Sequence, residues 1–407
     1  MVERRREVPV TARFIATATG NDGNAGTLAA PWKTINRGTQ GPEVQPGDSI
    51  GVLPGTYNEE VHCTRPGAAG RFVSLYSTVA RGALIRSPAN SYSAIQLATP
   101  YWDVFGFDVQ CGAGYGSGID NTANAPKSHH LSARGNYVHD CPGGGINLAW
   151  GDRYYIGGNE VSRNAGLNTY QTSGITIYQP QDNSGDATPG WRNVVEGNWS
   201  HDNAETMPGN HTDGNGLIFD DFHNGQQNGH QTVPYPFGAL ARWNLLTNNG
   251  GSGAHSAWSD FIEYDENTLA GNYRDNSNLA TWRGGLMALF SSQNTARGNL
   301  CLANLALNLA NTAIMWGQSP TGILDSNLTF DVAKPGTNSF GIDTNVPLIT
   351  RQRYGANPQL GADWLPTAAP AIGLGAPRFM GSVAPSPVAT LPADVRAALV
   401  KILQDYP

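Results

Sequence analysis

The segment Arg134-Gly135-Asn136, followed after a turn by Gly145-Ile146-Asn147-Leu148, introduces a pattern that recurs along the chain. An asparagine precedes, by a few residues and a turn, a glycine that opens an apolar strand. The same order returns at Gly157-Gly158-Asn159 with Gly174-Ile175-Thr176-Ile177, and at Glu196-Gly197-Asn198 with Gly216-Leu217-Ile218-Phe219. Later copies centre on Asn244, Asn267, Asn299 and Asn327, so the successive asparagines are 23, 39, 46, 23, 32 and 28 residues apart. Internal repetition of this kind indicates a solenoid.

The shortest spacing matches one coil of a parallel β-helix. Such a coil holds two or three strands and stacks on the next coil at ~4.8 Å. The recurrent asparagine fits an internal ladder in which each side-chain amide bonds its equivalent one coil on. Apolar residues alternate inward, as Leu217 and Phe219 do, and longer spacings are coils with inserted loops. The sequence therefore predicts an all-β fold: a single-stranded right-handed parallel β-helix with inserted loops and a short C-terminal helix.

A column of charged residues stands two positions before the ladder asparagines. Its members alternate in sign: Glu196, Arg242, Asp265, Arg297 and Asp325. Stacked neighbours of opposite charge attract by ~0.2–1 kcal/mol per pair. We interpret this column as structural.

Composition excludes several classes of protein. The 407 residues include 50 Gly but only 25 Lys and Arg, which disfavours helices and suits short strands joined by tight turns. With a formal charge of −7 and no basic block, the chain is not expected to bind nucleic acid. No apolar run reaches membrane-spanning length. Because Met1 to Arg6 lack an apolar stretch, we expect that a signal peptide has been removed and that the protein is secreted or periplasmic.

The cysteines match no zinc-binding spacing; they are Cys63, Cys111, Cys141 and Cys301. Cys111 and Cys141 lie about one repeat apart, so a disulfide between them is one interpretation. Buried free thiols are the other, and the sequence leaves both open.

Both ends of the repeat region carry a family resemblance. Within residues 14–60, Pro31-Trp32-Lys33-Thr34-Ile35 and Pro54-Gly55-Thr56-Tyr57 resemble the opening coil of secreted carbohydrate-active β-helices. Asn357-Pro358-Gln359-Leu360 resembles their closing segment. The chain is thus similar to the pectate-lyase-like β-helix superfamily over residues 14–375, a likeness that implies fold more than substrate.

The two ends of the chain lie outside this domain. Residues 1–13 are interpreted as an N-terminal extension. Residues 376–407 form a Pro- and Ala-rich tail in which Val395, Leu399 and Ile402 share one face of the expected helix. We expect this helix to cap the last coil, and docking to another subunit is the alternative.

Polar chemistry is densest in the segment from His211 to His223. The two largest repeat spacings bracket the coils around Asn159, Asn198 and Asn244, and inserts of this length are typical of functional loops. These inserts are Gln179 to Gly190, Ala204 to Asp213 and Phe222 to Phe237. The central third of the solenoid is therefore where a site is expected.

The alternation of the repeat places individual side chains on this strand. With Phe219 pointing inward, Asp220 points outward between Tyr178 on the coil before and Ala257 on the coil after. His255 lies one coil on and two residues back, so strand geometry puts its Cα ~8 Å from that of Asp220. These outward side chains are expected to share one wall of the solenoid.

Three carboxylates within nine residues, Asp213, Asp220 and Asp221, are predicted to bind Ca²⁺, which prefers several oxygen ligands. The ion would hold a uronate carboxylate and acidify the C5 proton, so that a base removes it and the 4-linked sugar leaves. His255 is the preferred base and Tyr178 a candidate proton donor. Structural roles are the alternatives: a turn for Asp213, an exposed strand position for Asp220 and a surface hydrogen bond for His255.

Other polar and aromatic residues complete the predicted site. Arg283 is a candidate for binding a carboxylate or for acting as the base. Substrate contacts are expected from residues that follow the strands or line the inserts, where aromatic rings can stack on sugars: His211, Trp150, Gln179, Trp258 and His223. Trp150, Gln179, Asp221, Trp258 and Phe290 are expected to form one column.

The acidic strand is similar to the calcium site of polysaccharide lyase family nine, a β-helix family, which implies calcium-assisted elimination. That family uses a lysine base, whereas Lys33, Lys127, Lys334 and Lys401 do not align with this strand. Polygalacturonase-type hydrolases, also β-helices, carry Asn-Thr-Asp and Asp-Asp motifs. His211-Thr212-Asp213 and Asp220-Asp221 resemble these motifs at a closer spacing and without a later Gly-His-Gly.

We therefore expect a polysaccharide lyase that cleaves a uronate-containing acidic polysaccharide by β-elimination, with Ca²⁺ as its cofactor. A β-helix glycoside hydrolase with paired carboxylates is one alternative, and the separation of the pair would set inversion or retention. A non-catalytic glycan-binding β-helix is another. The protein is expected to be a monomer or a trimer.

Overall fold

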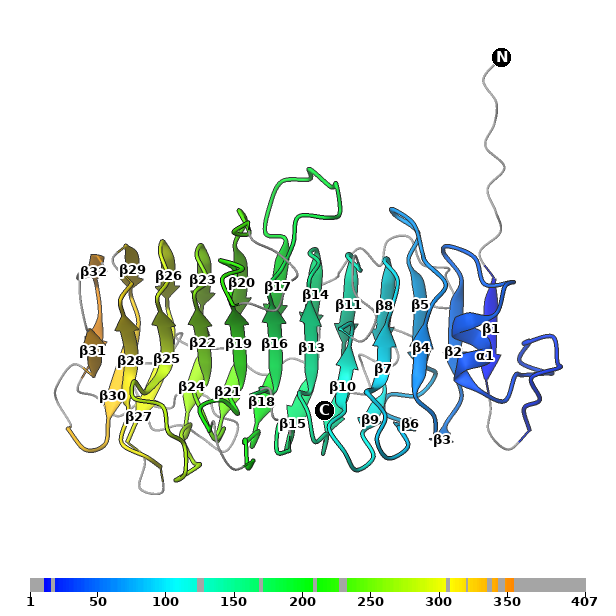
Figure 1. Cartoon of the computed structure of the whole chain (residues 1–407), viewed down its shortest axis with the longest axis horizontal. Helices are drawn as coiled ribbons and strands as arrows, with labels where there is room; N and C mark the ends of the chain where they lie inside the picture. The colour runs from blue at the N-terminus through cyan, green and yellow to red at the C-terminus, as the bar shows by residue number, and fades with distance from the viewer. Residues whose placement is uncertain are drawn as a thin grey trace, which may run out of the picture.

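The structure, a computed structural model, is built from three parallel sheets that share one core. It describes residues 11–15, 19–122, 128–167, 171–207, 211–226, 233–304, 308–319, 321–334, 339–342 and 348–354. Each coil gives one strand to sheet 1, then one to sheet 2 and one to sheet 3, and the coils stack along the long axis of the molecule (Figure 1). This arrangement confirms the right-handed parallel β-helix predicted from the repeat.

The strands of each sheet are short and come from successive coils. Sheet 1 comprises β1 (Ala12–Ile15), β2 (Ser49–Val52), β5 (Val73–Ser77), β8 (Trp102–Phe105), β11 (Leu131–Arg134), β14 (Tyr154–Gly157), β17 (Asn193–Glu196), β20 (Ala239–Arg242), β23 (Ile262–Asp265), β26 (Asn294–Arg297), β29 (Gly322–Asp325) and β32 (Leu348–Thr350). Sheet 2 comprises β3 (Gly55–Tyr57), β6 (Ala83–Arg86), β9 (Asp108–Gln110), β12 (Tyr137–His139), β15 (Glu160–Ser162), β18 (Trp199–His201), β21 (Leu245–Thr247), β24 (Thr268–Ala270), β27 (Leu300–Ala303), β30 (Leu328–Asp331) and β33 (Arg353–Tyr354). Sheet 3 comprises β4 (Val61–Cys63), β7 (Ser93–Leu97), β10 (Ser117–Asp120), β13 (Ile146–Ala149), β16 (Ile175–Tyr178), β19 (Leu217–Asp220), β22 (Ala254–Ala257), β25 (Gly284–Leu289), β28 (Thr312–Gly317) and β31 (Phe340–Ile342).

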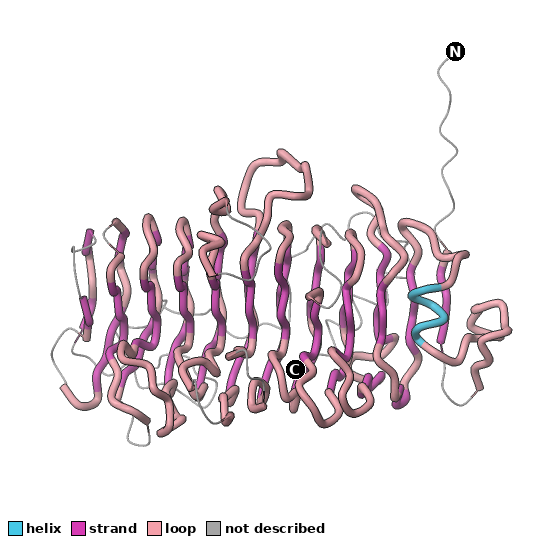
Figure 2. Tube along the Cα trace, viewed as in Figure 1, coloured by secondary structure: helices cyan, strands magenta, loops and turns pink. Residues whose placement is uncertain are grey.

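The helix α1 (Ile35–Gln40) lies at the N-terminal end of the solenoid (Figure 2). Thr34 caps it, since its hydroxyl accepts a hydrogen bond from the backbone N–H of Arg37 at 3.2 Å. The buried side of α1 includes Ile35, which joins the core of the first coils. The C-terminal helix expected within residues 376–407 lies outside the described residues. Nowhere in the described part of the chain is there a helix with the length and apolar character needed to cross a membrane.

The asparagines of the repeat form the predicted ladder between sheets 1 and 2. Asn244 donates its backbone N–H and its side-chain Nδ2 to Oδ1 of Asn267, at 3.0 and 2.9 Å. Its own Oδ1 accepts the same two bonds from Asn198, and its Nδ2 also donates to the carbonyl of Val195. The side chain is fully buried with every polar atom bonded. This ladder confirms the register inferred from the sequence.

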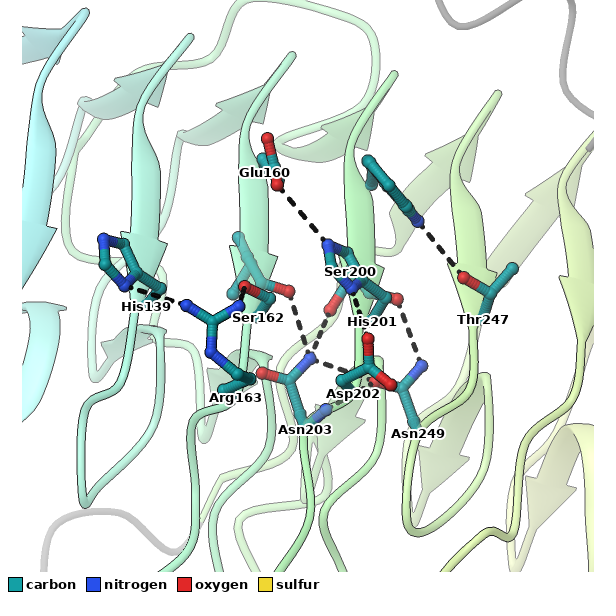
Figure 3. Close-up of polar contacts among 12 residues, drawn as sticks. His139, Glu160, Ser162, Arg163, Ser200, His201, Asp202, Asn203, Thr247 and Asn249 are labelled. Atoms are coloured by element: carbon teal, nitrogen blue, oxygen red, sulfur yellow. Dashed lines mark hydrogen bonds and ion pairs between the residues drawn. The ribbon is translucent and has the colours of Figure 1, made fainter. Parts of the chain in front are cut away.

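A second asparagine ladder, which the sequence analysis missed, runs between sheets 2 and 3. Asn203 donates its backbone N–H and Nδ2 to Oδ1 of Asn249, which repeats both bonds to Asn272 (Figure 3). Asn164 precedes them in the same ladder. Its members stand five residues after those of the first ladder, so a fixed Asn-x4-Asn spacing was available as a signal.

The glycine of each repeat is required by this second ladder. A Cβ built on Gly174 would lie 2.5 Å from both the Ser200 hydroxyl and Nδ2 of Asn203, closer than real side chains approach. At Gly216 a Cβ would lie 2.7 Å from Nδ2 of Asn249. The recurrent glycine thus marks the corner where the chain enters sheet 3 beside the buried amides.

The charged column has the predicted register but not all of the predicted pairs. Glu196 pairs with Arg242, whose Nε lies 2.6 Å from Oε2 of the glutamate. Arg297 instead reaches Glu263, on its neighbouring strand, at 3.2 Å. Asp325 pairs with Arg351. Long arginine side chains can choose among several carboxylates on the outer face, which register alone does not determine.

The cysteines are free thiols, so the structure favours the second of the two interpretations for Cys111 and Cys141. Cys141 is buried and Cys111 is partly buried beside the core.

Secretion and the oligomeric state, monomer or trimer, stay predictions.

We predict that Asn244→Ala and Asn249→Ala each lower the free energy of unfolding by about 1–3 kcal/mol, because both leave buried donors and acceptors unpaired. Chemical denaturation monitored by circular dichroism measures the loss. Asn276→Ala, at an exposed position, is the matched control and should cost no more than about 0.5 kcal/mol. The two-ladder description is wrong if Asn249→Ala is as mild as this control.

Candidate active site

Asp220 ends β19 and faces outward from sheet 3. It pairs in register with Tyr178 on β16 and with Ala257 on β22, as the repeat predicts. Oδ1 accepts a hydrogen bond of 3.0 Å from Nε2 of Gln226, which lies on the following insert. Burial, and then the charge of Asp221, raise the pKa of Asp220 to about 7. This carboxyl group therefore exchanges its proton near neutral pH.

Asp213 precedes the same strand and lies close enough to interact electrostatically with Asp220. Burial raises the pKa of Asp213 well above its ordinary value, and the charges of Asp220 and Glu205 raise it further. The backbone N–H of Asp213 donates to Oε2 of Glu205 at 3.2 Å. Asp213 and Asp220 are thus two interacting carboxyl groups at one site, and both hold their protons unusually strongly.

Three residues around Asp213 were missed by the sequence analysis. Glu205 is only 1% exposed, and burial raises its pKa to about 7. Asp275 places Oδ2 2.9 Å from Nδ1 of His211. Asn278 donates its side-chain N–H to the carbonyl of Thr212 at 3.2 Å. All three lie on inserted loops, whose conformation no repeat constrains, so the sequence held no signal for them.

His255 lies on the outer face of β22, where it pairs in register with Ile218 of β19. The structure therefore brings it to the same wall as Asp220, one strand over and two residues back. Its Nε2 is buried and has no hydrogen-bond partner among the described residues. Burial lowers the pKa of His255 to about 4, so the imidazole is neutral at physiological pH.

Asp221 differs from Asp220 because the chain turns between them. It adopts a left-handed conformation with φ of 52°, and its carboxylate points to the following insert. Oδ1 accepts the N–H of Gly225 at 2.9 Å, and Oδ2 accepts the N–H of Gln226 and Nε2 of Gln179 at 2.7 and 2.8 Å. Asp221 is 1% exposed. Its carboxylate holds the insert in place.

This geometry bears on the predicted calcium site. Both oxygens of Asp221 already accept hydrogen bonds from the backbone of the following insert, so this carboxylate is committed to the loop. Across the described residues, no three His, Cys, Asp or Glu side chains are grouped to hold a metal ion. As they stand here, Asp213, Asp220 and Asp221 do not fit a calcium site. Calcium binding stays a prediction.

The predicted column follows the ends of the sheet 3 strands. Its five members share the left-handed conformation, with φ between 43° and 56°: Trp150, Gln179, Asp221, Trp258 and Phe290. The rings of Trp258 and Phe290 stack with centroids 4.9 Å apart and planes 7° from parallel. Trp258 is 40% exposed. An accessible flat aromatic surface therefore borders the acidic strand.

The remaining predicted residues have identifiable partners. Arg283 donates from Nη2 to the carbonyl of Asn278 at 3.2 Å, so it supports the loop against Asp213. His223 places Nε2 2.9 Å from Oδ1 of Asp260. The Tyr178 ring lies 6.4 Å from that of Trp150, beside Asp220 in register. Tyr178 and His223 lie at the carboxyl ends of the sheet 3 strands, whereas Arg283 precedes the start of β25 at their opposite ends.

A second polar cluster lies on the outer face of sheet 2 (Figure 3). His201 places Nδ1 2.7 Å from Asp202 and Nε2 3.5 Å from Glu160. Burial alone would lower the pKa of His201, but these two carboxylates outweigh it and raise the pKa. His139 is held in the same way, by Asp108 and Asp140. Because these groups are paired on both sides, we interpret the cluster as structural.

We predict that Asp221→Ala destabilises the protein more than Asp220→Ala does. Asp221→Ala should lower the free energy of unfolding by about 2–3 kcal/mol, because three donors lose their acceptor. Asp220→Ala should cost less than about 1 kcal/mol, since its carboxyl group accepts one exposed side-chain hydrogen bond, from Gln226, and no backbone N–H of the insert. Thermal melting measures both. Equal losses would show that Asp220 is also a structural residue.

Comparisons with known proteins give a likeness of fold. No family model and no curated protein matches the sequence. The solved structure of pectate lyase Pel9A aligns with 95% of this chain and 90% of its own, at 13% identity and a TM-score of 0.46. The A-module of the Azotobacter vinelandii mannuronan C-5 epimerase AlgE4 covers 84% of this chain and 98% of its own, at 10% identity and a TM-score of 0.46. The GH136 lacto-N-biosidase from Eubacterium ramulus covers 83% and 68%, at 11% identity and a TM-score of 0.40. The pectate lyase and the epimerase module are parallel β-helix proteins, as this chain is.

Proposed function

We propose that this protein cleaves glycosidic bonds in a polysaccharide, with Asp213 and Asp220 as its acid and base. The observation that carries the proposal is the pair itself. Two carboxyl groups on the outer wall of a solenoid hold their protons more strongly than usual, because burial and neighbouring carboxylates disfavour their charged forms. General acid–base cleavage of a glycosidic bond requires one group that donates a proton and one that accepts a proton, and a pair of carboxyl groups can supply both.

The surroundings of the two groups suggest which is the acid. Burial, and then the charges of two other carboxyl groups, Asp220 and Glu205, favour the protonated form of Asp213, which is the form that an acid needs. It would donate that proton to the glycosidic oxygen as the bond to the anomeric carbon breaks. Asp220, with a pKa of about 7, would take the proton of the attacking water. The Trp258 surface beside them suits the face of a sugar ring.

Elimination from a uronate, expected from the sequence, is the second candidate. The specific observation in its favour is His255, a neutral imidazole with an unpartnered Nε2 on the same wall as Asp220. It could take the C5 proton while a protonated Asp213 or Asp220 donates to the leaving oxygen. The low pKa of His255 makes it a weak base, which places elimination second.

We predict that the protein releases new reducing ends from a polysaccharide panel without forming unsaturated ends, and that Asp220→Asn lowers kcat/KM by about 10²–10⁴-fold. The amide keeps the shape of the side chain but cannot accept a proton. A reducing-sugar assay and ultraviolet absorbance distinguish the two chemistries.

Asp265→Asn on sheet 1 is the matched control, because burial also raises the pKa of Asp265 although it lies far from the site. This variant should keep full activity. Unsaturated products that disappear in His255→Ala would establish elimination instead. Retained binding without any cleavage would indicate a glycan-binding protein.

The proposed pair also predicts a pH profile. Since Asp220 must be ionised to act as a base, kcat/KM should rise with pH until about 7 and fall at higher pH as Asp213 loses its proton. The hydrogen bond from Gln226 lowers the pKa of Asp220, so Gln226→Ala should move the rising limb to higher pH. Gln110→Ala on sheet 2 should leave the limb in place. A rising limb that is unmoved in Gln226→Ala would contradict the assignment of Asp220 as the base.

A further inference from the structure

His201 lies on the outer face of sheet 2 between two carboxylates (Figure 3). Its Nδ1 is 2.7 Å from Oδ2 of Asp202, and its Nε2 is 3.5 Å from Oε1 of Glu160 on the preceding coil. A neutral imidazole carries one N–H and one lone pair, so it can donate to only one of them. The Trp199 ring stacks on the imidazole with centroids 4.0 Å apart, which also favours a cation. The geometry therefore selects the positively charged form of His201, and Glu160, His201 and Asp202 form a histidine clamp.

Charged groups approach His201 from several elements. Glu160 lies on β15 and is also paired with Arg81. Asp202 follows β18 and lies in the field of Arg163. The strand on the other side, β21, contributes no charged residue. Burial alone would lower the pKa of His201, but the two carboxylates outweigh it and raise the pKa. The contacts of the charged form are therefore complete below the ordinary histidine pKa of about 6.5 and are lost as the pH rises through the raised value.

The Asp202 side of the histidine clamp continues to an insert beside the candidate active site. Oδ1 of Asp202 lies 2.7 Å from Nη1 of Arg274. This arginine belongs to the insert of residues 271–283, which connects β24 to β25. Its backbone N–H donates to the carbonyl of Asn249, a member of the second ladder, at 3.0 Å. The start of the insert is thus tied to sheet 2 by a charged side chain and by a backbone bond.

The rest of the insert holds the segment that leads into Asp213. Asp275 places Oδ2 2.9 Å from Nδ1 of His211. The carbonyl of His211 accepts the N–H of Leu279 at 2.6 Å. Asn278 donates its side-chain N–H to the carbonyl of Asp213 at 3.4 Å. Since these residues of the insert closely follow the arginine, they link the histidine clamp to the backbone that carries Asp213.

We propose that the charged form of His201 is a positioning group for the candidate active site and acts through Asp202 and Arg274 on residues 271–283. With His201 charged, Asp202 lies between two cations and keeps the arginine in place. When His201 loses a proton, one carboxylate faces a lone pair and both lose a neighbouring positive charge, so Asp202 is held less firmly. The insert then loses a tie to sheet 2, and its hold on Asp213 weakens. The effect on catalysis rests on the proposed function, whereas the effect on the insert does not.

His139 provides a matched control on the same sheet. Its Nδ1 and Nε2 lie 2.5 and 2.8 Å from carboxylate oxygens of Asp140 and Asp108, so it is clamped in the same way. Asp140 pairs in turn with Arg163, which follows β15 and whose other side-chain hydrogen bonds in the described part of the chain go to sheet 2. His139 therefore shares the pH response of His201 but has no link to the insert.

The first test is hydrogen exchange of the full-length protein by mass spectrometry, corrected for the intrinsic rate, at about pH 6 and about pH 9. We expect residues 271–283 and 211–213 to be about threefold better protected at the lower pH, the size of effect that a partly exposed ion pair supports. His201→Gln keeps a polar side chain that cannot be charged, and it should remove this advantage. His139→Gln should leave it in place. An advantage that persists in His201→Gln, or that disappears equally in His139→Gln, overturns the proposal.

Arg274→Ala tests the link without disturbing the sheet, because the side chain is half-exposed. It should lower the protection at the lower pH to the value found at the higher pH. Adding His201→Gln to this variant should cause no further loss, since both changes break the same link. Additive losses would show that the two residues act independently and would overturn the link.

Catalysis is measured as the ratio of kcat/KM in His201→Gln to that of the unsubstituted protein, so that the titration of Asp220 cancels. We expect a ratio of about one-third at about pH 6 that approaches one at about pH 9. Arg274→Lys, which keeps the charge, should retain most of the activity that Arg274→Ala loses. A ratio of one at both pH values overturns the positioning role. If no polysaccharide is cleaved, the proposed function fails, and the exchange of residues 211–213 alone decides the proposal.

Discussion

Buried amide ladders determine the geometry of this molecule. Each ladder asparagine bonds the next coil through both its backbone N–H and its Nδ2, and neither water nor a shifted register can replace those partners. A displacement of one residue would leave a fully buried amide unpaired, which costs more than most single contacts in a protein. Because two such ladders stand at two corners of the coil, adjacent coils cannot slide against each other. The apolar core fills the space between the sheets but would tolerate small shifts that the amides forbid.

Because the register is fixed, the repeat alone predicts which residues that are distant in sequence lie side by side. Tyr178, Asp220 and Ala257 are neighbours on three coils, although inserted loops make their separations along the chain unequal. The register also places His255 on the wall that carries Asp220. Alternation along a strand then decides which side chains face out. Everything about the site that follows from stacking and alternation could be derived from the repeat.

The features of the site that the repeat does not predict lie where a strand ends and an inserted loop begins. Asp220 and Asp221 are adjacent and chemically identical, yet one faces solvent at the end of a strand and the other holds an insert through three accepted hydrogen bonds. Only the left-handed turn at Asp221 separates their roles, and tryptophan, glutamine, aspartate and phenylalanine all occupy that position in this protein. Glu205, Asp275 and Asn278 come from loops of unequal length, so no periodicity relates them to Asp213. The calcium prediction placed Asp221 beside Asp220 at the strand end, and only the loop geometry shows that its two oxygens accept hydrogen bonds from the insert and from Gln179.

The raised pKa values of the carboxyl groups at this site also reflect the division between the stacked strands and the loops. A stacked sheet can present outward carboxyl groups at regular intervals, where water would normally keep their pKa values low. Here burial, and then neighbouring carboxylates, raise the pKa values of Glu205, Asp213 and Asp220. Glu205 and Asp213 belong to the insert between β18 and β19, whereas Asp220 belongs to a strand whose register the ladders fix. The solenoid tolerates the electrostatic cost of these buried carboxyl groups because its folding free energy comes from many stacked coils and not from this site alone.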